Sequence, residues 1–393
     1  MLRRMNRTLV GLMILAGCGG DPEATSGGTS SGETSTGAAV SSSGGEIPTS
    51  AGTGSEGPQD TGSATTGGPA ETTTTATTET ATTTTAGSSS GSEDTGDEST
   101  TGSGDEVYDP NLDGPWEIAE VEGSIKVGSV DVAIDCFYPT GGPTPGPYPV
   151  VVVAHGFQLP PTQYTQYVKR LATHGYVALT ADFKAELFGT DHVANAQQVL
   201  GGIDWAADEP TLAGIADTNN VGLTGHSLGG KLAVHGAVLD DRVRASVTLD
   251  PVDGSQMCDQ VKCPDISAML PIDKPLGFVG ETLDGSGGFM PCAPQANNFL
   301  TFFAAASGPA LAVTVNGANH MSFLDDVDSC GFTCNFCQMP TLDNDTVNAL
   351  ARAYVVAFYG RYLKDEAGYD TYLIGAAAQE RYIEPGLVDV MVK

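Results

Sequence analysis

Basic side chains are scarce in this 393-residue chain, which has 17 Lys and Arg against 48 Asp and Glu and a formal net charge of −31. The imbalance extends into the C-terminal part, because residues 107–393 hold 34 acidic and 14 basic side chains. Binding to nucleic acid requires a cationic surface that neutralises phosphates, and so does electrostatic attraction to anionic lipid. We therefore expect no nucleic-acid partner, and a small-molecule partner that is neutral or weakly charged.

Near the N-terminus the chain also lacks an apolar run long enough to cross a bilayer, since residues 9–16 form the only apolar stretch there. Three arginines precede this stretch, which is typical of a secretory signal peptide. The tetrapeptide Leu15-Ala16-Gly17-Cys18 resembles the lipobox of bacterial lipoproteins. The resemblance implies a signal peptide over residues 1–18, a lipid on Cys18 and anchoring in the bacterial cell envelope, at the outer membrane or cell surface. A plain secretory signal is the alternative.

Residues 19–107 lack the apolar side chains that a folded domain needs and consist almost entirely of Gly, Ser, Thr, Ala and acidic residues. Between residues 21 and 106 there are 14 acidic residues and no Lys or Arg. Such a segment cannot bury enough apolar surface to offset the entropy cost of ordering, so we predict a disordered linker. A flexible linker of this length has a root-mean-square reach of about 50 Å. Residues 108–393 are then expected to form one folded domain.

Cysteines are few, and Cys18 already has an assigned role among the eight. Disulfides are permitted in an exported protein. We expect Cys136, which lies inside a predicted strand, to remain a buried free thiol, and Cys258 to pair with Cys263. Further bridges are expected among Cys292, Cys330, Cys334 and Cys337. These last three lack nearby histidines, so the spacing does not favour a metal site, and we expect no metal and no other cofactor.

Predicted strands alternate with predicted helices along residues 116–365. Continuous apolar runs at 148–154 and 176–181 are typical of strands that are buried on both faces. Other expected strands are 116–124, 129–139, 220–224, 244–250, 275–281 and 310–315, and expected helices are 161–173, 192–207, 228–239, 297–306 and 346–362. This alternation predicts an α/β domain with a mostly parallel sheet and an antiparallel pair at one edge.

The pentapeptide Gly225-His226-Ser227-Leu228-Gly229 joins a predicted strand to a predicted helix. Glycines on both sides of a serine at a strand–helix turn form the nucleophile elbow of the α/β-hydrolase fold. Ser227 is therefore the candidate nucleophile. The oxyanion hole of this fold uses two backbone N–H groups, which correspond here to Phe157, after the strand 148–154, and Leu228. A glycine-rich turn in another α/β protein is the alternative.

Among the six histidines, His320 follows a predicted strand at the place where this fold carries its general base. His174 is expected at the surface, and His155 and His226 are expected to shape the loops that contain them. For the acid that orients the imidazole, Asp250 is the first candidate because it ends the strand 244–250. Asp284, in a glycine-rich loop that we expect to be mobile, is the second candidate, and Asp253 is the third.

Four motifs occur in order: Gly225-His-Ser-Leu-Gly-Gly, Leu249-Asp-Pro-Val-Asp-Gly, Pro291-Cys-Ala-Pro with Asn297 and Phe302-Phe303, and Gly317-Ala-Asn-His-Met-Ser-Phe-Leu-Asp-Asp. Together they resemble the chlorophyllase-like α/β hydrolases over about residues 116–365, and the order is also similar to platelet-activating-factor acetylhydrolases. The resemblance implies that Asp250 is the acid. Plant chlorophyllases have Arg at the position of Leu228, so the resemblance implies carboxylic-ester hydrolysis rather than cleavage of chlorophyll.

The sequence therefore predicts a serine hydrolase that cleaves small neutral or apolar esters with Ser227, His320 and Asp250. Two other functions use the same scaffold. An acyltransferase would pass the acyl group to an alcohol other than water, and a surface-binding lipoprotein would have no catalytic activity.

The lipobox generates a prediction about location. Cys18→Ala should move the protein from the membrane fraction to the soluble fraction with unchanged specific activity, because the linker separates the anchor from the predicted domain. Fractionation followed by an esterase assay measures both. A variant that stays membrane-bound would indicate an uncleaved anchor, and a soluble but inactive variant would contradict the independence of the two parts.

Overall fold

The computed structural model describes residues 107–186, 190–254, 258–286, 291–330, 334 and 336–393. The predicted signal peptide, Cys18 and the linker up to residue 106 lie outside the described residues. Within the described part of the chain, no helix is both long and apolar enough to span a bilayer.

The described residues form a nine-stranded sheet in the order β1-β2-β4-β3-β5-β6-β7-β8-β9. The strands are β1 (Glu117–Val127), β2 (Val130–Gly141), β3 (Tyr148–Ala154), β4 (Val177–Asp182), β5 (Ala216–Gly225), β6 (Val243–Leu249), β7 (Leu276–Glu281), β8 (Ala310–Val315) and β9 (Val388–Val392). The six strands from β4 to β8 are parallel, while β1, β2 and β9 pair in the antiparallel sense. This arrangement confirms the predicted α/β-hydrolase fold.

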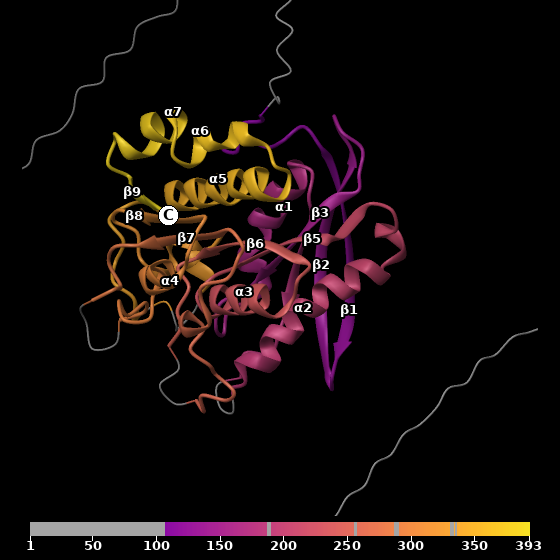
Figure 1. The fold of residues 1–393 in the computed structure, drawn as a ribbon, viewed down its shortest axis with the longest axis horizontal. Helices are drawn as coiled ribbons and strands as arrows, with labels where there is room; N and C mark the ends of the chain where they lie inside the picture. The colour runs from indigo at the N-terminus through magenta and orange to yellow at the C-terminus, as the bar shows by residue number, and fades with distance from the viewer. Residues whose placement is uncertain (1–106, 187–189, 255–257, 287–290, 331–333, 335) are drawn as a thin grey trace, which may run out of the picture. The chain divides into compact units, whose positions relative to one another are not determined.

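Helices cover both faces of the sheet (Figure 1). They are α1 (Thr165–Thr173), α2 (His192–Asp208), α3 (Leu228–Leu239), α4 (Phe299–Ala305), α5 (Asn344–Leu363), α6 (Asp370–Leu373) and α7 (Ala376–Ala378). Strand β3 shows why both faces need cover: Val151 and Val153 join the apolar cluster of α1 and α5. The alternating Val150 and Val152 join the cluster of α2 and α3. Because successive side chains point to opposite faces, a strand buried on both faces reads as a continuous apolar run.

The sequence failed to predict β9 and the short helices after α5. Strand β9 pairs with β8 through Val388↔Val315 and Val392↔Leu311, but only its first residue is buried, so it lacks the apolar run of a central strand. The predicted helix 161–173 is in fact a 3-10 turn, Pro161–Tyr164, followed by α1.

The expected surface position of His174 is wrong. Its side chain is buried, and its Nε2 lies 2.9 Å from the carbonyl oxygen of Leu112. Burial lowers the pKa of His174 to about 4. The segment before β1 folds back over the end of α1, a long-range contact that local sequence does not reveal.

Candidate active site

Ser227 lies on a strained turn between β5 and α3, with φ 55° and ψ −119°. A Cβ atom on Gly225 would come within 2.3 Å of the Gly229 backbone, and one on Gly229 within 2.2 Å of the Ala154 carbonyl oxygen. Only glycine fits at these two positions. Such a sparsely populated backbone conformation costs about 1–3 kcal/mol, and conformations of this kind cluster at functional sites.

Three side chains from three sheet connections form a continuous hydrogen-bonded chain. His320 Nε2 lies 2.9 Å from Ser227 Oγ, and its Nδ1 lies 2.6 Å from Asp250 Oδ2. A carboxylate oxygen accepts, so Nδ1 carries the proton and Nε2 can accept from the serine hydroxyl. Ser227 is half-buried, whereas His320 and Asp250 are buried.

Asp250 comes directly after β6 and also has a positive φ, 41°. Its N–H donates to the Val279 carbonyl at 2.6 Å, which fixes the turn against β7. Burial raises the pKa of its carboxyl, while the hydrogen bond and the charge of His320 oppose the rise. The site thus contains an acid that is fully desolvated and is held by both its main chain and its side chain.

Asp284, the second candidate acid, contacts the main chain of His320 and not its ring. Its Oδ2 accepts the His320 N–H at 2.9 Å, and its Oδ1 accepts the Gln338 N–H at 2.8 Å. It is also buried, and residues 287–290 of the loop that follows it lie outside the described residues. Asp284 therefore fixes the backbone that carries the imidazole.

The third candidate acid, Asp253, forms an ion pair with Lys231 of α3 at 2.9 Å, with both side chains buried. Its Oδ2 accepts the Ser267 N–H at 2.9 Å. This pair joins the loop that carries Asp250 to the helix that follows Ser227.

Phe157 and Leu228, the candidate oxyanion donors, lie after β3 and at the first position of α3. The first N–H groups of a helix have no acceptor within the helix, so the Leu228 N–H is free of intrahelical bonding. Beside Phe157, the Gly156 N–H donates to the Tyr164 hydroxyl at 3.1 Å, which fixes this loop.

Glu281 at the end of β7 was missed by sequence reasoning, although a glutamate that closes an apolar strand is itself a signal. Its Oε2 accepts the Asp284 N–H at 2.7 Å and also the Leu283 N–H. Burial, and next the charge of Asp250, raise the pKa of Glu281 to about 8. Two buried carboxyl groups, those of Asp250 and Asp284, therefore bond to His320, and the third, that of Glu281, is close enough to both for their charges to raise its pKa.

Disulfides fix the loops around this site, as predicted. The pairs are Cys258–Cys263, Cys292–Cys337 and Cys330–Cys334, and Cys136 is a buried free thiol. Cys337 directly precedes Gln338, so the bridge to Cys292 holds the residue that donates to Asp284.

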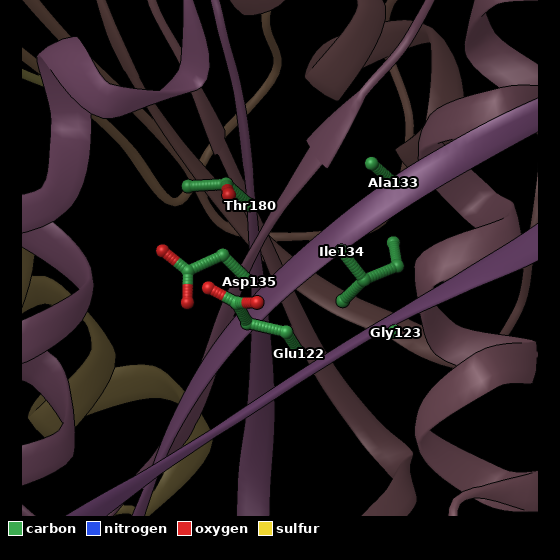
Figure 2. Close-up of a pocket in the computed structure, with 6 residues that line it drawn as sticks. All are labelled: Glu122, Gly123, Ala133, Ile134, Asp135 and Thr180. Atoms are coloured by element: carbon green, nitrogen blue, oxygen red, sulfur yellow. The ribbon is translucent and has the colours of Figure 1, made fainter.

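A shallow hollow of about 280 Å³ opens elsewhere, on β1, β2 and β4 (Figure 2). It is lined by Glu122, Gly123, Ala133, Ile134, Asp135 and Thr180. The carboxylates of Glu120, Glu122 and Asp135 lie within 4.8 Å of one another, and burial raises the pKa of Asp135 to about 6. None of the predicted site residues lines this hollow.

The raised pKa of Glu281 predicts a pH dependence of stability. The folded state keeps this proton up to about pH 8, whereas the unfolded chain loses it near 4.5. The free energy of unfolding should therefore fall as the pH rises through this window, by at most about 1.4 kcal/mol per pH unit. Glu281→Gln should remove this component, so that its stability relative to wild type increases towards pH 8.

Urea denaturation at several pH values measures the difference in the free energy of unfolding between Glu281→Gln and wild type. Glu117→Gln, at the exposed start of β1, controls for the loss of one negative charge. If the free energy of unfolding changes with pH in the same way for Glu281→Gln and wild type, Glu281 is ionised over the whole pH range.

The sequence of the chain matches a known protein family. The sequence profile of the Chlorophyllase family matches residues 116–390. Chlorophyllase-2 and Chlorophyllase-1 of Arabidopsis thaliana are 29% and 30% identical to the chain over 205 residues, which cover 46% and 48% of this chain and 62% of each plant protein. The chain thus aligns with less than two thirds of their length.

The bis(hydroxyethyl) terephthalate hydrolase of Streptomyces coelicolor is 23% identical over 262 residues, or 67% of this chain and 72% of that protein. Since the profile match extends over most of its length, the chain belongs to the Chlorophyllase family.

Proposed function

We propose that the chain is a serine esterase that hydrolyses small carboxylic esters through an acyl-enzyme. The observation that carries the proposal is the hydrogen-bonded chain Ser227–His320–Asp250, with Ser227 on a strained elbow at the start of α3. Membership of the Chlorophyllase family supports an ester as the substrate. The relative named for hydrolysing bis(hydroxyethyl) terephthalate, an ester, supports it too.

In the first half-reaction, Ser227 Oγ attacks the ester carbonyl carbon while His320 Nε2 takes the hydroxyl proton. Asp250 keeps the other proton on Nδ1 and stabilises the imidazolium. The negative carbonyl oxygen is stabilised by the N–H groups of Phe157 and Leu228. Each such donor typically contributes about 2.7–4 kcal/mol to transition-state stabilisation.

The tetrahedral intermediate collapses when the C–O bond to the alcohol breaks and Nε2 gives its proton to the departing alkoxide. Water then attacks the acyl-enzyme, passes its proton to Nε2, and Ser227 leaves with that proton. All proton transfers use side chains of the chain itself, so the scheme needs no cofactor.

We propose a neutral or apolar ester as the substrate. The 34 acidic against 14 basic side chains in residues 107–393 would repel an anionic substrate. Leu228, beside the nucleophile, is a buried apolar residue where plant chlorophyllases have Arg, so this position adds no cation to the site. A panel of p-nitrophenyl esters of graded acyl length would define the acyl preference.

We propose further that the enzyme is anchored in the bacterial cell envelope, at the outer membrane or cell surface, by a lipid on Cys18. The support is the charged and apolar leader with its Leu15-Ala16-Gly17-Cys18 sequence. The acidic, Thr-rich linker would then hold the catalytic domain away from the membrane.

Ser227→Ala should abolish p-nitrophenyl ester hydrolysis and labelling by a fluorophosphonate probe, because both need the nucleophilic hydroxyl. The thermal melt should match that of wild type, since the elbow loses only one atom. Turnover retained by the purified variant would refute the assignment of the nucleophile. A wild-type protein that neither labels nor hydrolyses any ester would refute the proposed function.

The choice of acid can be tested by two matched substitutions. Asp250→Asn should lower kcat by about three to four orders of magnitude, because the amide no longer holds the required tautomer of His320. Asp284→Asn should lower kcat by about tenfold or less, because Asp284 touches only the main chain of His320. The kcat values of both variants are measured on folded proteins with matching thermal melts. The reverse ranking would identify Asp284, after β7, as the acid.

A further inference from the structure

Tyr164 and His226 form a buried polar pair that the proposed chemistry does not use. Both side chains are completely buried, and the Tyr164 hydroxyl lies 2.9 Å from His226 Nδ1. His226 Nε2 lies 2.8 Å from the carbonyl oxygen of His320. The rings of the two histidines also pack together, with centroids 4.7 Å apart.

The protons of this pair can be placed from the acceptors alone. The His320 carbonyl can only accept, so His226 Nε2 carries a proton. Burial holds the pKa of His226 well below 6.5, so the ring is neutral and its Nδ1 accepts. The Tyr164 O–H therefore donates to Nδ1, and its oxygen accepts the Gly156 N–H at 3.1 Å.

The resulting relay runs from the Gly156 N–H through Tyr164 and His226 to the carbonyl of His320. Gly156 directly precedes Phe157, the proposed oxyanion donor, and His320 is the proposed base. The relay thus joins the two loops on either side of Ser227, and His226 is also the chain neighbour of that serine. Together with Asp284 on the His320 N–H, it holds the base by both polar groups of its peptide backbone.

The surroundings of Tyr164 strengthen this connection. Its neighbour Gln163 accepts the Asp326 N–H at 2.9 Å and donates to the Asp326 carbonyl at 2.8 Å. Tyr167 donates to the Phe323 carbonyl at 3.0 Å. The segment from Gln163 to Tyr167 therefore binds the loop after His320 at several points, and the relay is the one that reaches His320 itself.

Space around the relay is fully used. A Cβ atom on Gly156 would lie 3.0 Å from His226 Nδ1 and 3.2 Å from the Tyr164 hydroxyl oxygen. The contact between the oxyanion loop and the pair therefore favours glycine at position 156, because a larger residue would have to displace these side chains.

We propose that Tyr164 and His226 are positioning residues that align the proposed base with the oxyanion loop through this relay. The inference rests on the proposed esterase function. It assigns no contact with substrate to either residue, so the expected effect is on kcat and not on KM.

Two substitutions of His226 separate the links of the relay. The amide nitrogen of Gln can replace Nε2 and still donate to the His320 carbonyl. Asn reaches only the position of Nδ1, so it leaves that carbonyl without its donor. An unsatisfied buried group costs about 1–3 kcal/mol, and misalignment of reacting groups lowers the rate. We expect His226→Asn to lower kcat about 10- to 100-fold relative to wild type, and its kcat to be at least about tenfold lower than that of His226→Gln. The KM of both variants should stay within about twofold of the wild-type value.

Tyr164→Phe should lower kcat about tenfold, because it removes the acceptor of the Gly156 N–H. Tyr359→Phe is the matched control, since it removes another fully buried hydroxyl, one that lies 2.7 Å from Thr224 Oγ1. Tyr359→Phe should leave kcat unchanged, while it lowers the melting temperature by about as much as Tyr164→Phe does.

Equal kcat values for His226→Asn and His226→Gln would overturn the relay, as would equal kcat values for Tyr164→Phe and Tyr359→Phe. If His226→Asn does not fold, the comparison of Tyr164→Phe with Tyr359→Phe decides alone. Wild-type activity is measured in the same assay with the same fluorophosphonate probe. Loss of the relay and loss of the proposed function are therefore distinguishable, because only the latter requires an inactive wild type.

Discussion

Four hydrogen bonds hold His320, and the rest of the site is arranged around them. Its ring bonds to Ser227 and Asp250, its N–H to Asp284, and its carbonyl to His226. These partners follow β5, β6 and β7, while His320 itself follows β8. Since parallel strands end at the same edge of a sheet, neighbouring strands deliver these residues to one place.

This arrangement carries an electrostatic cost. Asp250, Glu281 and Asp284 are all buried within one region, and like charges in low dielectric oppose each other's ionisation. The structure limits the cost by leaving Glu281 with a raised pKa, while Asp250 and Asp284 have hydrogen-bond donors. The neutral pair of Tyr164 and His226 bonds to the His320 carbonyl without adding a charge.

The sequence predicted the parts of the fold that depend on local patterns. Apolar runs located β3 and β8 residue for residue, because both strands are buried on two faces. The glycines at 225 and 229 marked the elbow because their spacing follows from close backbone contacts. Strand β9 carries no such run, since it lies at an edge and only its first residue is buried.

The hydrogen-bond partners of the site were less accessible to prediction. The structure brings together Ser227, His320 and Asp250, the three residues chosen from motif order, and their catalytic roles are part of the proposal. The contact of Asp284 with the backbone, the raised pKa of Glu281 and the bond from Tyr164 to His226 depend on how distant segments pack. No spacing in the sequence encodes them.

The order of the strands in the sheet also has a kinetic consequence. The loop at Gly156 and the proposed base, His320, are separated by more than half of the described domain, and β9 (Val388–Val392), which pairs with β8, comes later still in the sequence. Contacts between residues so far apart in sequence form late and slowly in folding. His320 can therefore reach Ser227 only after synthesis has passed β8, and a nascent chain that ends before residue 320 has the Ser227 turn without the proposed base.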